Sequence, residues 1–293
     1  MQDTVISLVS DELSADVALH GAELVRLDDA VGNALLWDGD PAFWAGRAPL
    51  LFPIVGTLRG GTFRHRGATH ALPRHGFARR STFAVVDRGT GHVTLRLEDD
   101  AASRAVWPFA FRLDVTHALA GRCLTTTVRL DNRSDEAMPA SFGFHPGFRW
   151  PLPGAGPRAA HAIRFAEAEP DAVRRLDGDG LLDSRPRPSP VVGDRLALDD
   201  SLFDEDVLFF DRLRSRRLIY GTDAVRLIVD FPDMPHLGLW TKPGAGFLCI
   251  EPWAGHADPA DAAGELADKP GTRMIAPGAT TVYSMAVTLD FGG

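Results

Sequence analysis

Hydrophobic and polar residues alternate with a period of two along much of this chain. The alternation runs through residues 82–99, 111–132 and 217–231, and a short turn containing Gly interrupts each stretch once. A further alternating stretch occupies residues 280–291. Because successive side chains of a strand point to opposite faces, this pattern predicts a series of β-hairpins and a C-terminal strand.

Helical signals are few and short. Asp40 followed by Pro41 predicts a single turn, and residues 99–108 predict a short helix that ends before Pro108. Many strands at short spacing with so little helix favour an all-β fold, either a β-sandwich or a large closed β-architecture.

Two stretches rich in Pro, Gly and polar residues interrupt the strand pattern, residues 151–161 and 176–194. They lie within the alternating pattern rather than between blocks of different composition. We therefore expect them to be loops inserted in a single domain that spans residues 1–293.

Composition and charge limit the partners of the protein. Of 293 residues, 45% are hydrophobic and 24% charged, which is typical of a soluble globular protein. The net charge of −8 argues against nucleic acid and anionic membranes as partners.

The N-terminal segment has no basic region followed by a long apolar run, so we expect no secretory signal and a cytoplasmic protein. Cys123 and Cys249 are too few for a disulfide framework, and we expect both to be core thiols.

Several common chemistries lack their motifs in this sequence. It has no Gly-rich phosphate loop, no G-x-S-x-G nucleophile elbow and no Cys-x-x-Cys pair. His65, His70 and His75 are spaced five apart, so on a strand neighbouring members point to opposite faces, and Pro73 would break a helix. We therefore expect no metal site from this run.

Two segments of the sequence each place one titratable residue in apolar surroundings. His145 lies among phenylalanines in "SFGFHPGF", where glycines permit close backbone approach. Glu251 follows the apolar run "FLCI" and precedes Pro252, and carboxylates avoid such places unless they are paired or used. Each has a plain alternative, a core histidine for one and a rim residue paired with Arg for the other. Together they suggest an acid and a base in one cleft that moves protons on a sugar. Trp240 would offer a flat surface to a sugar ring, if it is not a core residue.

A basic cluster in "ALPRHGFARRST" raises a separate question about the substrate. Arg74, His75, Arg79 and Arg80 lie within seven positions of an otherwise acidic chain. Arginine forks suit phosphate oxygens, but the same arginines can pair with the many acidic residues of the chain.

Four segments, in order, resemble the aldose 1-epimerase (galactose mutarotase-like) superfamily: "APLLFPIVGTLRGGTFRHRGATHALPRHGFAR", "SFGFHPGFRWPL", "LFDEDVLFF" and "LWTKPGAGFLCIEPWAG". The resemblance extends from about residue 20 to the C-terminus and is to a bacterial branch with His-Gly-Phe-Ala-Arg and Cys-Ile-Glu-Pro-Trp signatures. It implies a large antiparallel β-sandwich, called a supersandwich, with the active site in a cleft across one concave sheet. It also implies interconversion of the α and β anomers of an aldose without cofactor or metal. Galactose itself is not implied, because the segments around His75 and Glu251 belong to the less characterised branch.

Roles carried over from the family fall on particular positions. Glu251 matches its general base, His145 its general acid, and His75 the second histidine that contacts the sugar. Arg59 in "GTLRGG" matches a substrate-binding Arg. A hydroxyl-binding Asp falls on Asp206, with Asp204 and Asp211 as neighbouring alternatives.

Two other functions remain open at this point. Hexose-6-phosphate 1-epimerases share the His-Gly-Phe-Ala-Arg signature, and in that case Arg74, Arg79 or Arg80 would hold the phosphate; we count Arg79 among the candidate substrate-binding residues. A non-catalytic carbohydrate-binding protein would keep the cleft without the chemistry, but binding alone does not require both Glu251 and His145.

Overall fold

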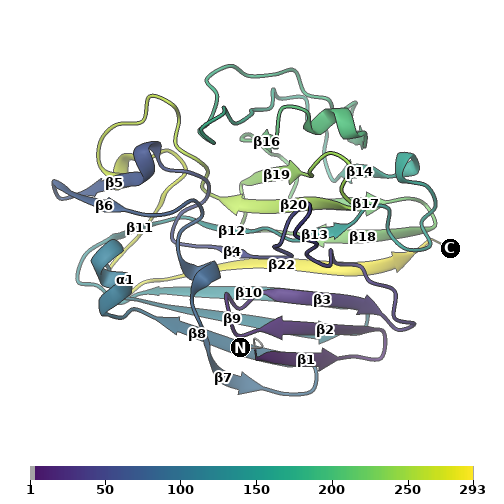
Figure 1. Ribbon diagram of the computed structural model, residues 1–293, viewed down its shortest axis with the longest axis horizontal. Coiled ribbons are helices and arrows are strands. Elements are labelled where there is room, and N and C mark those ends of the chain that lie inside the picture. The colour runs from purple at the N-terminus through teal and green to yellow at the C-terminus, as the bar shows by residue number, and fades with distance from the viewer. Residues whose placement is uncertain (1–3, 293) are drawn as a thin grey trace.

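The largest sheet has nine antiparallel strands. In spatial order they are β15 (Arg195–Ala197), β14 (Ala162–Phe165), β17 (Arg217–Gly221), β18 (Val225–Asp230), β22 (Thr280–Phe291), β10 (Cys123–Asn132), β9 (Phe111–Ala120), β8 (His92–Glu98) and β7 (Ala84–Arg88). Figure 1 shows this sheet running through the computed structural model, which describes residues 4–292.

The alternating stretches of the sequence form this sheet as expected. In β9 and β22 every second side chain is buried, because one face of each strand lies on the core. Gly121 has a φ of +54°, the left-handed conformation that the tight turn between β9 and β10 requires. The predicted hairpins over residues 82–99, 111–132 and 217–231 are confirmed.

A second, six-stranded antiparallel sheet carries the site described below. Its strands are β16 (Leu208–Phe210), β19 (His236–Trp240), β20 (Phe247–Ala254), β12 (Phe142–Phe144) and β4 (Leu50–Leu51), and β13 (Gly147–Arg149) also pairs with β20. All eight residues of β20 are buried, so both faces of this central strand are covered.

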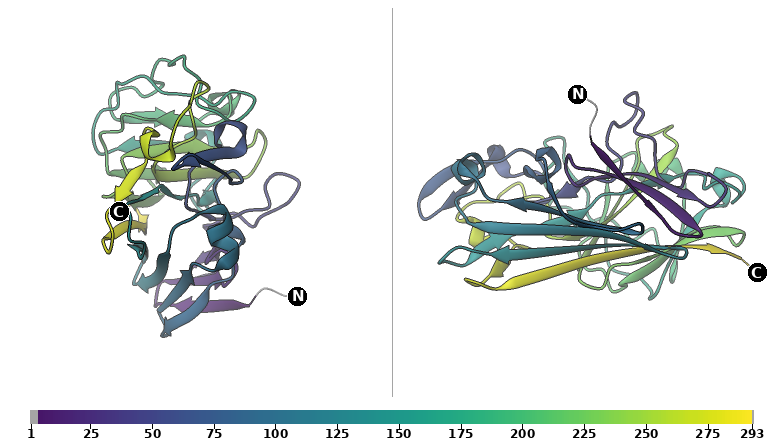
Figure 2. Two further views of the ribbon diagram at one scale, coloured as in Figure 1. Left: turned by 90° about the vertical axis from the view of Figure 1, so that its left-hand side faces the viewer. Right: turned by 90° about the horizontal axis from the view of Figure 1, so that it is seen from below.

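Smaller sheets complete the fold. They are formed by β1 (Val5–Val9), β2 (Leu13–Ala18) and β3 (Leu24–Asp29), by β5 (Thr62–His65) and β6 (Ala68–Ala71), and by β11 (Met138–Ala140) and β21 (Arg273–Ile275). The views in Figure 2 show the sheets stacked in layers. The main core joins these layers, with Leu13 from β2, Val115 from β9, Phe144 from β12 and Leu239 from β19 in one buried cluster. The fold is the β-sandwich that the sequence predicts.

Helical structure is scarce in the described part of the chain. The predicted helix is α1 (Ala101–Val106), and the Asp100 side chain caps it by accepting from the Ser103 amide. The turn predicted at Asp40 is present, where the Phe43 and Trp44 amides both donate to the Asp40 carbonyl. No helix in residues 4–292 is long and apolar enough to cross a membrane.

The two cysteines differ in their surroundings. Cys249 is buried against Trp37, Ala245 and Phe247, as expected of a core thiol. Cys123 is only half-buried, which corrects the expectation for this residue, because its side chain lies on the face of β10 that points away from the core.

Candidate active site

A cavity of about 260 Å³ lies over the face of the six-stranded sheet that points away from the core, just below the usual size range of small-molecule sites. Its walls come from the sheet and from loops that cover it. The lining residues are Trp44, Gly56, Arg74, His75, Arg79, His145, Leu176, Leu182, Asp206, Val207, Phe209, Trp240, Glu251, Trp253, His256 and Ala257.

Glu251 lies in the floor of this cavity because of the alternation along β20. Leu248 and Ile250 point into the main core, so Glu251 and Trp253 point to the opposite face. Glu251 is 1% exposed, an unusual environment for a carboxylate.

His145 is placed next to Glu251 by a break between two short strands. β12 pairs with β20 through Gly143 and Trp253, and β13 pairs with it through Gly147 and Cys249. The turn between β12 and β13 therefore lies beside the middle of β20. It brings His145 Nε2 to 3.1 Å from Glu251 Oε2.

Trp44 covers the imidazole of His145, a contact that sequence reasoning missed. The two rings are stacked with centroids 4.9 Å apart and an interplanar angle of 25°. Gly147 permits this approach, since a Cβ there would lie 3.0 Å from Trp44 Cζ3. Trp240 meets both rings edge-on, at 6.1 Å from His145 and 5.7 Å from Trp44. The feature of the sequence that could have pointed to Trp44 is its position in the turn that begins at Asp40.

Trp253 lies flat across its neighbouring strands. A Cβ at Gly143 would be 2.7 Å from Trp253 Cδ1, and a Cβ at Gly238 would be 2.8 Å from its far ring edge. These two glycines therefore create the space that the indole occupies. The result is a wide apolar surface next to Glu251.

His75 enters the cavity from a strained turn with a φ of +66°. The Gly56 amide approaches its Nδ1 at 3.1 Å, and Arg74 Nε approaches its Nε2 at 3.1 Å. A neutral imidazole has only one acceptor nitrogen, so His75 can accept from only one of these two donors at a time. Because each ring nitrogen faces an N–H donor, the site disfavours a second proton on the ring. Burial, reinforced by the charges of His145 and Arg74, holds the pKa of His75 well below its usual value.

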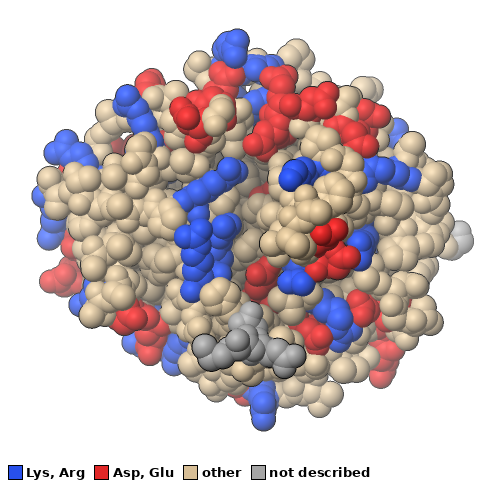
Figure 3. Space-filling model, in the orientation of Figure 1, with Lys and Arg blue, Asp and Glu red and all other residues tan. Residues whose placement is uncertain are grey.

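The arginines of the basic cluster divide into two groups. Arg74 and Arg79 line the cavity, and Arg80 does not. Figure 3 shows a band of basic side chains beside a hollow near the middle of this face, with acidic side chains gathered above it. Burial lowers the pKa of Arg79, and the charge of Arg80 adds to this effect.

Arg59, which was expected to bind substrate, does not line this cavity. Its amide donates to Asp258 Oδ2 at 2.9 Å, and its Nη1 donates to the Ala262 carbonyl at 2.9 Å. Gly60, with a φ of +63°, turns the chain immediately afterwards. These contacts direct the Arg59 side chain into a separate surface cavity lined by Arg64 and Asp258.

Asp206 is the aspartate of its segment that reaches the cavity. It has a φ of +63° and lines the cavity, whereas Asp204 and Asp211 are not among the lining residues. Leu176 and Leu182, from the long loop expected over residues 176–194, also line it. Sequence reasoning placed no function on that loop.

Burial disfavours charge on both members of the central pair. It raises the pKa of Glu251 well above the usual value, with Arg74 opposing this rise and Asp206 adding to it. Burial also lowers the pKa of His145 to about 3, helped by the charges of Arg79 and Arg74. The pair therefore holds one proton over a wide range of pH, and burial favours its location on Glu251.

Unsatisfied polar atoms gather at this site. Within the described residues, His145 Nδ1 and Trp253 Nε1 are buried without a hydrogen-bond partner, and the contact of Glu251 Oε2 is the ion pair with His145. Such atoms are rare in folded proteins and are available to a ligand.

A metal ion would find three donor atoms here. The ligating atoms of His145, Cys249 and Glu251 all lie within 4.8 Å of one another. Burial, together with the charge of Glu251, raises the pKa of the Cys249 thiol well above its usual value. This disfavours the thiolate that a metal requires.

Comparisons with known proteins place the chain in a family. The model of the family described as aldose 1-epimerase matches residues 4–270. The chromosomal form of protein LacX from Lactococcus lactis subsp. lactis is 31% identical over 295 positions, covering 97% of this chain and 99% of that protein. A galactose mutarotase related enzyme from Lactobacillus acidophilus has a TM-score of 0.88 at 29% identity, covering 99% of this chain and 98% of that one. A galactose mutarotase-like protein from Lactobacillus casei has a TM-score of 0.90 at 26% identity, covering 98% of this chain and 100% of that one. The chain belongs to the aldose 1-epimerase family.

Proposed function

We propose that this protein is an aldose 1-epimerase that interconverts the α and β anomers of an unphosphorylated hexose. Its family supports an epimerase-type enzyme that acts on a sugar. The observation that carries the finer assignment is the buried pair of His145 and Glu251, 3.1 Å apart beside aromatic rings in a cavity of about 260 Å³.

The reaction needs one proton removed and one delivered. Glu251, ionised, takes the proton of the anomeric hydroxyl, and His145, protonated, gives a proton to the ring oxygen as the bond from that oxygen to the anomeric carbon breaks. The ring opens to an aldehyde, which rotates about its bond to the next carbon. The reverse transfers then close the ring on the other face.

Burial of the pair favours ring opening. The ion pair that starts the reaction becomes neutral Glu251 and neutral His145 when the ring opens, which is the charge state that burial stabilises. The buried surroundings of Glu251 and His145 thus stabilise the neutral pair that is present when the sugar ring is open. Arg74, whose charge lowers the pKa of Glu251, keeps the ionised carboxylate accessible.

The other cavity residues would hold the sugar. Neutral His75 and the Asp206 carboxylate offer hydrogen bonds to hydroxyl groups, and Trp240 offers an apolar surface for the carbon face of the ring. We assign Arg79 to the same task.

A second candidate, hexose-6-phosphate 1-epimerase, is favoured by one observation. Arg74 and Arg79 both line the cavity, and arginines suit phosphate oxygens. Because both also lie close enough to the central pair to affect the pKa of His145, they have a use without phosphate.

Anomer exchange measured by NMR on glucose, galactose and glucose-6-phosphate tests these assignments. We expect acceleration with the free hexoses, and Glu251→Gln should lower it by roughly 10²- to 10⁴-fold while circular dichroism stays unchanged. Glu98→Gln, at a surface ion pair with Arg133, is the matched control. Acceleration confined to glucose-6-phosphate would favour the second candidate. Sugar binding in calorimetry without acceleration would instead indicate a non-catalytic binding protein.

A further inference from the structure

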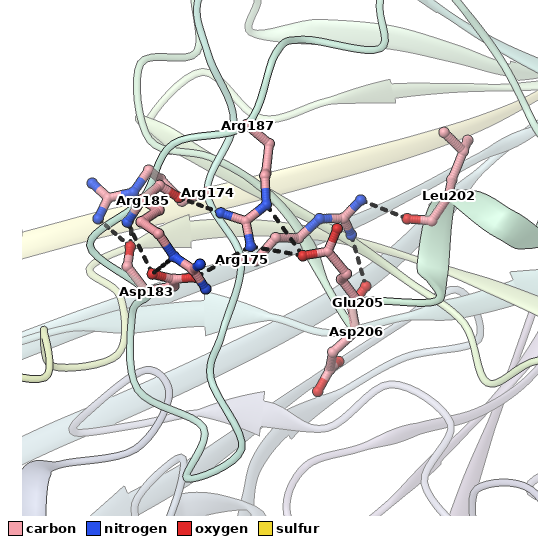
Figure 4. Close-up of polar contacts among 8 residues, drawn as sticks. All are labelled: Arg174, Arg175, Asp183, Arg185, Arg187, Leu202, Glu205 and Asp206. Atoms are coloured by element: carbon pink, nitrogen blue, oxygen red, sulfur yellow. Dashed lines mark hydrogen bonds and ion pairs between the residues drawn. The ribbon is translucent and has the colours of Figure 1, made fainter.

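A buried arginine outside the cavity holds the turn that carries Asp206. Arg175 is 8% exposed, and its Nη1 donates to the Asp206 carbonyl at 3.0 Å while its Nη2 donates to the Leu202 carbonyl at 2.7 Å. Leu202 belongs to the 3₁₀ helix Asp200–Phe203, and Asp206 lies just before β16. The guanidinium therefore joins the two ends of a short connection, as Figure 4 shows.

Asp206 requires such support because of its backbone. Its φ of +63° is a left-handed conformation that few residues other than Gly adopt. Strained residues of this kind persist only where several contacts fix them, and here the Asp206 amide also donates to the Phe203 carbonyl at 3.1 Å. Its carboxylate points away from the arginines in Figure 4 and lines the cavity.

The Asp206 carboxylate is also free of competing contacts. In the part of the chain that the structure describes, it forms no ion pair, although Asp183 and Glu205 on the same loops both pair with Arg187. Arg187 is thus occupied by other acids, and the oxygens of Asp206 remain for a ligand.

Arg175 is itself fixed in place by the strand that forms the cavity wall. The neighbouring Arg174 exchanges two backbone hydrogen bonds with Phe209 of β16, at 2.8 and 3.1 Å, and the Asp183 amide donates to the Arg175 carbonyl at 2.9 Å. Among the described residues, no carboxylate lies within ion-pair distance of Arg175, although burying an unpaired guanidinium is costly. Arg175 is therefore held by its hydrogen bonds to two backbone carbonyls and not by a salt bridge.

We propose that Arg175 is a positioning residue that fixes Asp206 for contact with a sugar hydroxyl, an inference that rests on the proposed function for its ligand. Arg175 does not line the cavity itself, so it acts through its bond to the Asp206 backbone. Its removal should release the strained turn and leave the rest of the site in place.

Substitution of Arg175 and Asp206, alone and together, tests this inference. Arg175→Met should weaken binding of galactose and glucose in calorimetry by roughly 10-fold or more, the order expected for a lost hydrogen bond to a charged group. Arg175→Lys, which can reach one carbonyl, should be intermediate. Asp206→Gly removes the carboxylate without strain, and in that background Arg175→Met should have no further effect on affinity. Arg185→Met, which removes an exposed side chain paired with Asp183 on the same loop, should bind as the wild type does.

Amide hydrogen exchange of residues 202–207, measured on the same variants, gives a readout that needs no sugar. It should be faster in Arg175→Met than in the wild type or in Arg185→Met. Unchanged exchange, or additive losses of affinity in the double variant, would overturn the inference. A wild type that accelerates no anomer exchange would instead contradict the proposed function, while the exchange data would still decide whether Arg175 holds the turn.

Discussion

The Nε2 atom of His145 lies 3.1 Å from the Oε2 atom of Glu251, with one side chain from a turn and the other from the central strand beside it. Burial lowers the pKa of His145 to about 3 and raises that of Glu251, so a single proton is shared by the pair over a wide pH range. The two groups titrate as a unit, and this determines how activity depends on pH.

We expect kcat/KM for anomer exchange to show no acid-side decline as pH falls through 6.5, the usual pKa of histidine, toward about 5. The pair gains its second proton only as pH falls toward 3, and it loses its single proton only above the raised pKa of Glu251. Activity should therefore decline on the alkaline side, where the acid is lost. The measurement is exchange NMR in a buffer series, corrected for spontaneous exchange. A decline centred near the usual pKa of histidine would contradict this assignment.

Trp44→Leu should lower kcat/KM roughly 10-fold, because it removes an aromatic ring that packs on His145 at 4.9 Å and limits its orientation. Trp44→Phe retains a ring and should stay close to the wild type. Equal rates for the Leu and Phe variants would show that stacking does not orient the imidazole.

The strands of this fold are predictable from local pattern, as β22 shows. Its bounds coincide with the alternating stretch at residues 280–291, because a half-buried strand records its two faces in its sequence. The same logic explains why β20, which is buried on both faces, reads as a continuous apolar run with Glu251 as its exception.

The site is less predictable, because it depends on contacts between distant segments. His145, Glu251 and His75 were each notable for their own neighbours, and the structure brings them into one cavity. Arg59 does not join them, because its side chain donates to the Ala262 carbonyl, which is far away in the sequence. Trp44 was missed because its contact with His145 requires the space beside Gly147, a residue that is distant from Trp44 in the sequence.

Arg74→Gln should lower anomer exchange of glucose. The charge of Arg74 opposes the rise in the pKa of Glu251, so its removal makes the ionised base scarcer. Arg80→Gln, at a position that does not line the cavity, is the control. A loss seen with glucose-6-phosphate but not with glucose would indicate that Arg74 binds phosphate instead.

His117 does not line the candidate active site and gives a prediction about stability. It is buried, with Nε2 3.0 Å from the Ala22 carbonyl and Nδ1 3.0 Å from Thr126 Oγ1. Burial lowers its pKa from 6.5 to about 4, so between these values the unfolded chain binds a proton that the folded chain does not. The free energy of unfolding therefore falls as pH drops through this range.

His117→Gln should remove this part of the pH dependence. The full shift from 6.5 to about 4 corresponds to about 3 kcal/mol, so the wild type should lose up to that much more stability than the variant between pH 6.5 and pH 4. Glutamine can still bond to Thr126, which limits the cost of the substitution itself. Urea unfolding at several pH values measures the difference, with His92→Gln at an exposed position as the control. Parallel curves for His117→Gln and the wild type would show that His117 is not held neutral by burial, since a histidine with an ordinary pKa contributes no such slope.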